Sequence, residues 1–276
     1  MTDKRAADCH AHVFCGDDYP YSPETVYRPH PSQAGTAAKF RAVLDAHGFT
    51  HGLLVGAGPY GSDNRCMLEA IAASGGRFKG IALVKPGIAE AELANLAGKG
   101  VVGIRINLLN HGMRPLVEPG ADRLLARVKA LRWFVQIHCQ KDELAEAAPI
   151  LRKAGVRVMI DHFGRPDVAR GVAQPGFRTL LELGRSGDAV VKLSGPFRCS
   201  AEGYPYHDVD PFIAAAIEAF TPERCVWGSD WPFVRLDERM DYGPGLSCLP
   251  RWLPDASDRK KVLWDTPARL FEFSQG

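Results

Sequence analysis

The chain lacks several sequence features that would place it in other classes of protein. No apolar run approaches the roughly 18 residues that a membrane-spanning helix needs. Lys and Arg number 34 and Asp and Glu number 32, so the formal net charge is +2, with no basic block and no acidic tail. The first residues lead almost at once into a candidate strand, which leaves no room for a signal peptide. We therefore expect a cytoplasmic protein that binds neither membranes nor nucleic acid.

The seven cysteines lack the arrangement of a disulfide framework or a structural zinc site. Their number is odd, they are scattered along the chain, and no Cys-x-x-Cys pair occurs. Such usage favours a reducing compartment over an oxidising one. A chain of 276 residues can bury a large apolar core without cross-links. We therefore expect a fold that packing alone holds together.

What the sequence does contain is a regular alternation of β-rich runs and helical patterns. Eight short β-rich runs occur, at residues 7–12, 52–57, 79–85, 101–108, 133–139, 157–162, 189–194 and 225–230. Several are continuously apolar, as in parallel strands that are covered on both faces. No Gly-x-Gly-x-x-Gly turn follows the first run, which weakens a dinucleotide-binding fold. The pattern predicts an α/β protein, a (β/α)8 TIM barrel that forms one domain over residues 1–276.

Ionisable residues gather at the C-terminal ends of the predicted strands, where barrel active sites lie. His10 and His12 share strand parity, so both side chains point to the same side. The later strand ends carry Arg105, Asn107, His138, His162, Ser194, Arg198 and Asp230. Any one of them has a structural interpretation, such as a core histidine or an aspartate that caps the turn before Pro232. Their recurrence at one edge favours an active site.

Two loops and one lysine are further candidates. The loop at residues 58–64, with Tyr60, follows the second strand and is expected to line the pocket. The aromatic-rich insertion at residues 19–31 could act as a lid or could pack across the barrel without moving. Lys192 lies inside its strand, where burial would require a partner, so we predict a structural ion pair there.

Six segments stand in register across most of the chain. They are residues 8–14 (DCHAHVF), 60–64 (YGSDN), 103–107 (GIRIN), 161–167 (DHFGRPD), 192–198 (KLSGPFR) and 228–232 (GSDWP). Together they resemble the 2-pyrone-4,6-dicarboxylate lactonase group of the amidohydrolase superfamily. His-x-His alone is a weak signal, whereas six segments in order indicate the family, though not the substrate.

The resemblance implies a barrel enzyme that opens the ring of a small carboxylated lactone with water and needs no cofactor. It assigns the general base to Asp230 and places three histidines around the reacting carbonyl, namely His10, His12 and His162. It assigns the binding of substrate carboxylates to Arg105, Arg165 and Arg198. These roles agree with chemistry, because a guanidinium pairs bidentately with a carboxylate and a positioned carboxylate can accept a proton from water.

Two positions depart from the family pattern. His111, which is a further candidate for substrate binding, stands where another arginine is expected, which favours a lactone with one carboxylate or a sugar lactone. His138 stands where a tyrosine is expected, and it could bind substrate. With His10, His12 and Asp230, His138 would also complete the set that holds one zinc or manganese ion in metal-dependent relatives.

Three hypotheses therefore stay open. The first is a metal-independent lactonase, and the second is a metal-dependent sugar lactonase or non-oxidative decarboxylase of the same superfamily. The third, more remote, is a non-catalytic protein that keeps the pocket and binds a ligand. A homo-oligomer is compatible with each of them.

Overall fold

The computed structural model describes residues 5–33, 35–236 and 238–273. Within these ranges eight parallel strands form one sheet in sequence order. They are β1 (Ala7–Ala11), β2 (His51–Val55), β3 (Phe78–Ala82), β4 (Val101–Asn107), β5 (Phe134–His138), β6 (Arg157–Ile160), β7 (Ala189–Ser194) and β8 (Cys225–Gly228). The two edges of the sheet meet, because Asp230 N donates to His10 O and His12 N donates to Trp231 O, each at 2.8 Å. The predicted TIM barrel is confirmed.

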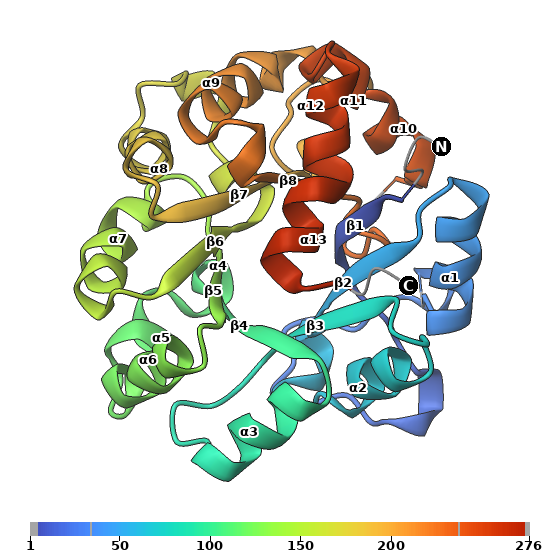
Figure 1. Cartoon of the computed structure of the whole chain (residues 1–276), viewed down its shortest axis with the longest axis vertical. Helices are drawn as coiled ribbons and strands as arrows, with labels where there is room; N and C mark the ends of the chain where they lie inside the picture. The colour runs from blue at the N-terminus through green and yellow to red at the C-terminus, as the bar shows by residue number, and fades with distance from the viewer. Residues whose placement is uncertain (1–4, 34, 237, 274–276) are drawn as a thin grey trace.

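Helices surround the strands, as Figure 1 shows. The longer ones are α1 (Ala37–Ala46), α2 (Arg65–Ala72), α3 (Glu90–Gly98), α6 (Ala121–Ala130), α7 (Glu143–Ala154), α8 (Pro175–Ser186) and α9 (Asp210–Phe220). The shorter ones are α4 (Leu108–His111), α5 (Arg114–Val117), α10 (Tyr242–Ser247), α11 (Leu249–Trp252), α12 (Ala256–Lys260) and α13 (Thr266–Phe271). Apolar residues repeat along the faces that pack on the strands, as Leu124, Leu125 and Val128 do in α6.

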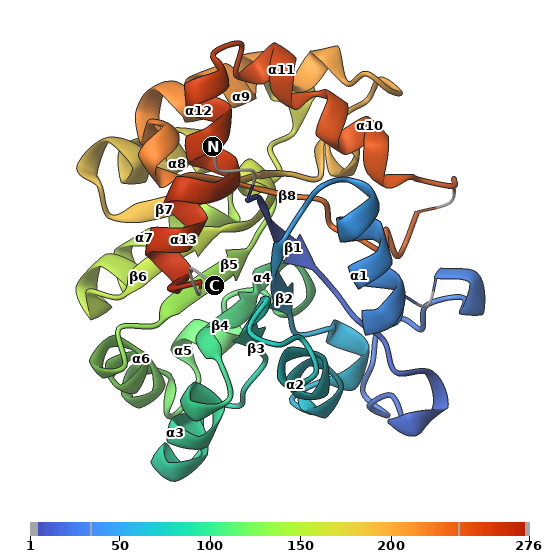
Figure 2. The same ribbon diagram turned by 45° about the vertical axis from the view of Figure 1, so that its right-hand side comes forward.

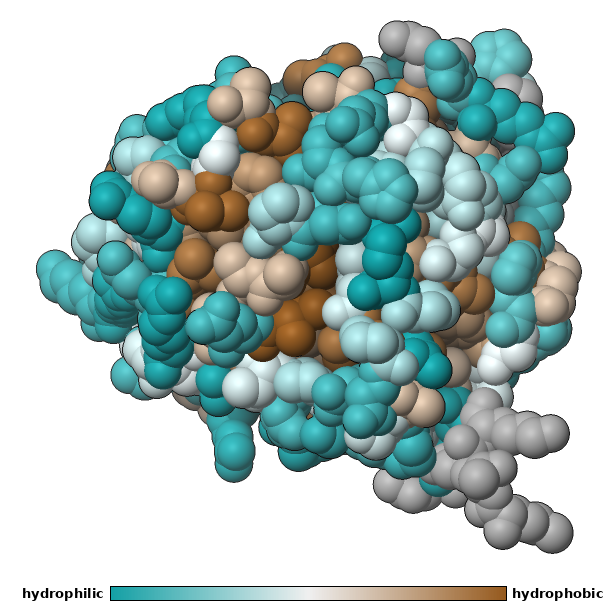
Figure 3. Space-filling model, turned by 90° about the horizontal axis from the view of Figure 1, so that it is seen from above, coloured by the Kyte–Doolittle hydropathy of each residue, from teal (hydrophilic) through white to brown (hydrophobic). Residues whose placement is uncertain are grey.

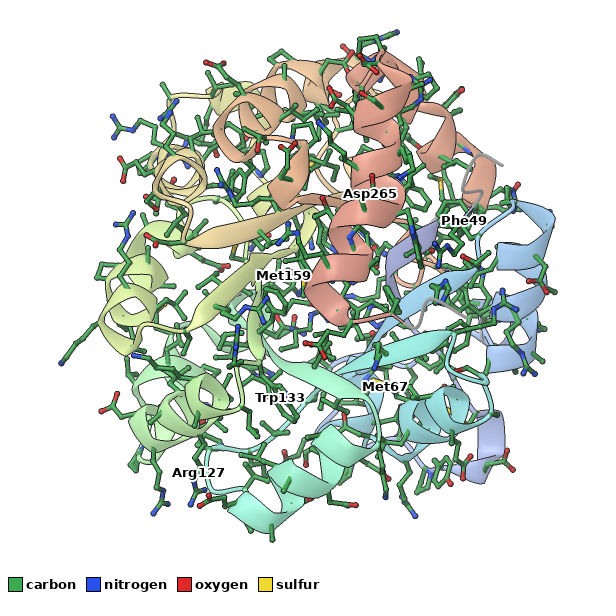
Figure 4. All side chains as sticks on the ribbon, viewed as in Figure 1. Phe49, Met67, Arg127, Trp133, Met159 and Asp265 are labelled. Carbon is green, nitrogen blue, oxygen red and sulfur yellow. A yellow bond between two sulfur atoms is a disulfide. The ribbon has the colours of Figure 1, made fainter. Side chains whose placement is uncertain are left out.

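Helix α13 closes the N-terminal end of the barrel and crosses the end that faces the viewer in Figure 1. Trp264, Leu270 and Phe271 from this region pack with Ala7 and Phe134 at the starts of β1 and β5. Met159 belongs to the same cluster and lies at the centre of the strands in Figure 4. Because this end is filled by apolar side chains, a polar site can form only at the opposite end.

The opposite end is built by the segments that follow the strands. The segment between β1 and α1 extends beyond α1 and α2 on the right of Figure 2, so it reaches across neighbouring units of the barrel. Gly228, the last residue of β8, permits the close approach of β1. A Cβ atom there would lie 2.6 Å from the Cβ of His10 and 2.7 Å from its backbone nitrogen. The position therefore requires glycine.

One disulfide corrects the expectation drawn from the cysteine pattern. Cys15, after β1, is bonded to Cys66 in α2, 51 residues further along the chain. Cys9, Cys139, Cys199, Cys225 and Cys248 are free. The expectation of a fold without cross-links was wrong for this pair, because spacing along the chain does not reveal that the loop after β1 crosses over the start of α2.

No helix in the described ranges is long and apolar enough to cross a membrane. Figure 3 shows a face on which apolar areas lie between hydrophilic residues. The large apolar side chains that are exposed come from separate parts of the chain, namely Val26, Val117, Val172 and Tyr204. Scattered exposure of this kind is ordinary for a globular protein.

Candidate active site

Asp230 lies at the centre of the candidate site, surrounded by the three predicted histidines. Its Oδ1 is 3.6 Å from Nε2 of His10 and 3.6 Å from Nε2 of His12. Its Oδ2 is 4.0 Å from Nε2 of His162. All four residues are at most 6% exposed. The tertiary structure therefore brings together the four residues that the resemblance assigned to catalysis.

Neighbouring strands hold these imidazoles in place. Nδ1 of His12 contacts the carbonyl oxygen of Val55 on β2 at 2.8 Å, so Nδ1 donates and Nε2 faces Asp230. Nδ1 of His162 contacts the hydroxyl of Ser194, the last residue of β7, also at 2.8 Å. A Cβ atom at Gly195, where φ is +58°, would lie 2.8 Å from Nδ1 of His162. Glycine after β7 thus makes room for this histidine.

A second buried carboxylate fixes the turn that carries Asp230. Asp8 on β1 accepts hydrogen bonds from the backbone nitrogen of Ser229 at 2.9 Å, from the Ser229 hydroxyl and from the Tyr242 hydroxyl at 3.1 Å. Burial raises the pKa of Asp8 to about 6, although these hydrogen bonds lower it in part. Asp230 itself has a φ of 64°, in the left-handed region. Backbone geometry of this kind is common at functional sites, where the surrounding structure holds it.

The electrostatics keep Asp230 ionised. Burial alone would raise the pKa of Asp230, but Arg198 and His162 outweigh burial and hold the pKa well below its usual 3.8. Arg198 donates from Nε to Asp230 Oδ2 at 2.7 Å and from a terminal nitrogen to Val234 O at 2.9 Å. Burial lowers the pKa of His162 from 6.5 to about 4, against the pull of Asp230. At neutral pH the site therefore contains an anionic Asp230 beside an uncharged His162.

A polar cluster lies behind the histidines and contains Lys192. Asp161 accepts hydrogen bonds at Oδ2 from Arg105 Nε at 3.1 Å and from Gln136 Nε2 at 3.0 Å. Nζ of Lys192 lies 3.4 Å from Asp161 Oδ1, and both side chains are fully buried. The ion pair predicted for Lys192 is confirmed. Two cations share one carboxylate here, and the side-chain amide of Gln136 links the lysine to it.

These groups face a cavity of about 430 Å³ at the C-terminal ends of the strands. Its volume is within the range of small-molecule sites, about 300–1,000 Å³. Predicted residues that line it are His12, Arg105, His138, His162, Arg165, Arg198 and Asp230. His10 is fully buried behind them. Arg165 bridges the rim, because one terminal nitrogen contacts His138 Nε2 at 3.4 Å and the other donates to Arg198 O at 3.3 Å.

Two of the predicted binding residues lie outside this cavity. Tyr60 and His111 line an adjacent cavity of about 560 Å³, which shares Tyr27, Arg105 and Asn107 with the first. The Tyr60 hydroxyl accepts a hydrogen bond from the backbone nitrogen of Cys15 at 3.0 Å, so it holds the loop after β1. The roles of both residues in substrate binding stay predictions.

Tyr27 and Arg235 are among the residues of the catalytic cavity that sequence reasoning missed. Tyr27 comes from the insertion after β1, and the guanidinium of Arg235 stacks over its ring, with the guanidinium carbon 5.1 Å from the ring centre. Burial raises the pKa of Tyr27 to about 12, so its hydroxyl stays protonated. The only sequence signals were an aromatic cluster and a cation five residues after Asp230, which many surface loops also contain.

The site contains enough histidines and carboxylates to hold a metal ion. They do not form the set of four ligands that was predicted from the sequence. Ligand-capable atoms of His10, His12 and Asp230 lie within 4.8 Å of one another, as do those of His10, Asp161 and His162. Among the described residues, His138 belongs to neither group. Two imidazoles, one carboxylate and a water would be enough for a catalytic zinc. Whether they fit depends on which nitrogen of His10 carries a proton.

Comparison with known proteins shows what this chain is similar to. A 2-pyrone-4,6-dicarboxylate hydrolase from Comamonas testosteroni is 34% identical over 96% of this chain and 90% of its own length. A 4-sulfomuconolactone hydrolase from Rhizobium radiobacter is 34% identical over 97% of this chain and 90% of its own.

Solved structures and a family model agree with these relatives. The crystal structure of a probable 2-pyrone-4,6-dicarboxylic acid hydrolase from Acinetobacter baumannii, with citric acid bound, has a TM-score of 0.88 and 32% identity. It covers 97% of this chain and 99% of that one. A family model described as amidohydrolase matches residues 7–273. The chain therefore belongs to the amidohydrolase family.

Proposed function

We propose that this protein is a hydrolase that opens the ring of a small carboxylated lactone with a water molecule that Asp230 activates. The observation that supports this proposal most strongly is the ionised Asp230 carboxylate, with three imidazoles around it and arginines lining the same cavity. An anionic base beside neutral hydrogen-bond donors suits attack on a carbonyl, and the arginines suit a negatively charged substrate.

The chemistry follows from where the charges lie. Arg198 occupies Oδ2 of Asp230, which leaves Oδ1 to accept a proton from water. The hydroxide formed attacks the lactone carbonyl, and an imidazole N–H that faces the site stabilises the oxyanion. When the oxyanion collapses, the ring C–O bond breaks, and the proton held by Asp230 passes to the departing ring oxygen. The product is an open chain with a new carboxylic acid, which ionises at neutral pH.

The cavity favours a lactone with two anionic groups. The sequence has no arginine at position 111, but Arg235 adds a fourth guanidinium to those of Arg105, Arg165 and Arg198 around the cavity. Two of the similar proteins are named for a lactone with two carboxylates and for one with a sulfo group. The Acinetobacter baumannii structure holds citric acid, a tricarboxylic acid. A doubly charged lactone is therefore the preferred substrate class.

The first experiment measures loss of the pyrone absorbance when purified protein is mixed with 2-pyrone-4,6-dicarboxylate in the presence of a chelator. We expect turnover by the wild type and a loss of about 10²–10⁴-fold in kcat for Asp230→Asn, the range for a general base. Asp122→Asn, an exposed position on α6, is the matched control. Full activity of Asp230→Asn would contradict the mechanism. Turnover confined to singly charged or sugar lactones would contradict the doubly charged substrate.

A further inference from the structure

Lys192 is a buried cation that takes no part in the chemistry proposed above. Its Nζ lies 2.7 Å from Gln136 Oε1, 3.1 Å from His10 Nδ1 and 3.4 Å from Asp161 Oδ1. An ammonium group has three N–H donors and no lone pair. The contacts with Gln136 Oε1 and His10 Nδ1 meet hydrogen-bond geometry, and each requires the neighbour to offer a lone pair, whereas Asp161 Oδ1 lies at ion-pair distance.

That requirement fixes the proton on His10. A neutral imidazole has one N–H and one lone pair, so if Nδ1 accepts from Lys192, the proton must be on Nε2. The competing arrangement has Nδ1 donating to Asp161 Oδ1, 3.2 Å away. Among the described residues, however, Asp161 Oδ1 has no hydrogen-bond partner of good geometry, whereas the contact between Lys192 and His10 meets the geometric criteria. The charged form of His10 is disfavoured as well, because it would place an N–H against the ammonium.

We propose that Lys192 is a positioning residue that holds His10 in the tautomer with its proton on Nε2, which makes His10 a donor to the substrate carbonyl and unfit to bind a metal. Nε2 of His10 is buried, faces Asp230 and has no hydrogen-bond partner in the part of the chain that the structure describes. It is therefore an unused N–H donor directed at Asp230, and it would become a donor to a lactone carbonyl that binds beside Asp230. The donor role rests on the proposed function, whereas the tautomer and the metal affinity do not.

His12 takes the opposite arrangement on the same strand. Its Nδ1 donates to Val55 O, so the neutral form has its lone pair on Nε2. A metal ion at His10, His12 and Asp230 would need lone pairs on both Nε2 atoms. Only one of the two imidazoles meets that condition while Lys192 is in place. The residues that resemble a metal site by position therefore do not fit one by protonation.

The direct test is nitrogen NMR of the wild-type protein labelled with ¹⁵N-histidine. Long-range couplings distinguish a protonated ring nitrogen from an unprotonated one, and the His10 signals are assigned by their absence in His10→Gln. We expect a protonated Nε2 and an unprotonated Nδ1 in His10, with the reverse in His12. A protonated Nδ1 in His10 would overturn the proposal without any variant of Lys192.

Substitutions sharpen the test. In Lys192→Met the side chain keeps its length but loses its donors, so Nδ1 of His10 should turn its proton to Asp161 and free Nε2. Gln136→Leu is the matched control, because it removes a partner of Lys192 at the same depth and leaves the contact with His10 intact. Lys192→Arg retains a donor and should restore the wild-type tautomer.

Three measured quantities are expected to change together in Lys192→Met and to keep their wild-type values in Gln136→Leu. The NMR pattern of His10 reverses, and zinc affinity rises about 10–100-fold, as when a carboxylate orients a histidine ligand. For lactone turnover, kcat falls about 10²–10³-fold with KM nearly unchanged, as on loss of one oxyanion donor. An unchanged tautomer in a folded Lys192→Met protein would overturn the proposal. A reversed tautomer without lactone turnover in the wild type would overturn the proposed function alone.

Discussion

The barrel contains two groups of charged side chains, a buried layer around Asp161 and a layer at the mouth around Asp230. The two layers differ in whether each charge has a partner of opposite sign. In the buried layer, Asp161 is shared by Arg105 and Lys192, so each charge has a partner. At the mouth, Arg198 pairs with Asp230, but no carboxylate of the described residues lies within 4.0 Å of the guanidinium groups of Arg165 or Arg235. Balanced charges fix side chains in place, whereas cations without an anionic partner are suited to bind an anion from solvent. The buried layer holds the side chains of the site in position, and the layer at the mouth selects the substrate.

The largest expected effect tests the balanced layer. Asp161→Asn removes the shared carboxylate and leaves two buried cations without it. Breaking a buried ion pair costs about 3–5 kcal/mol, so we expect a loss of that size in the free energy of unfolding, measured by chemical denaturation. Asp241→Asn removes the partner of Arg239 in an exposed pair and should change stability little. Equal stability of both variants would mean that the buried carboxylate contributes no more to stability than one in an exposed ion pair.

The next-largest expected effect tests the cations at the mouth of the barrel. Arg165→Met and Arg235→Met each remove a cation that we expect to pair with a substrate carboxylate. A hydrogen bond to a charged group contributes about 1.5–3 kcal/mol, so kcat/KM for a doubly charged lactone should fall roughly 10–150-fold. The loss should be smaller for Arg235, whose side chain is exposed to solvent. Arg123→Met, at an exposed position on α6, is the control. If these variants instead lower the free energy of unfolding and leave KM unchanged, Arg165 and Arg235 stabilise the fold and do not bind the substrate.

A third prediction concerns pH. The pKa of Asp230 is held well below 3.8, and that of His162 is lowered to about 4, so neither group titrates near neutral pH. We expect log kcat/KM to stay level from neutral pH down to about 4 and then to fall as His162 gains a proton. Because the folded-state pKa of His162 is below the ordinary 6.5, its contribution to stability is present above pH 6.5 and is lost as pH falls toward 4.

These two profiles are measured by steady-state kinetics and by denaturation across pH 3.5–8. The stability contribution is read as the difference between wild type and His162→Gln, since Asp8, with a pKa raised to about 6, acts in the opposite direction. An acidic limb of kcat/KM centred near 6.5 would contradict the assignment of a neutral His162.

The smallest effect separates two tyrosines. Tyr27 lines the catalytic cavity, whereas the Tyr60 hydroxyl holds the backbone of Cys15. A neutral hydrogen bond contributes about 0.5–1.5 kcal/mol. Tyr27→Phe should therefore raise KM about 2–10-fold without a loss of stability, and Tyr60→Phe should lower the free energy of unfolding by roughly that energy with KM unchanged. The reverse pattern would assign the substrate contact to Tyr60, as the sequence predicted.

The strands and the residues at their ends could be predicted because the information is local. Each strand is a short β-rich run, and parity along β1 places His10 and His12 on one side. In a closed parallel barrel, the C-terminal ends of all strands meet, so Asp230 and the predicted histidines had to converge once the fold was right. The sequence by itself therefore determined the barrel, its catalytic edge and the identity of most residues there.

Only the tertiary structure decided which loops and neighbours complete the site. Tyr27 and Arg235 meet because two long connections cross the same opening, and Cys15 joins Cys66 for a similar reason. The contact between Lys192 and His10 joins residues 182 positions apart. Contacts of this kind depend on loop path and on which side chains share a layer across strands, and neither leaves a periodic signal in the sequence. The protonation of the site therefore follows from packing and not from any motif.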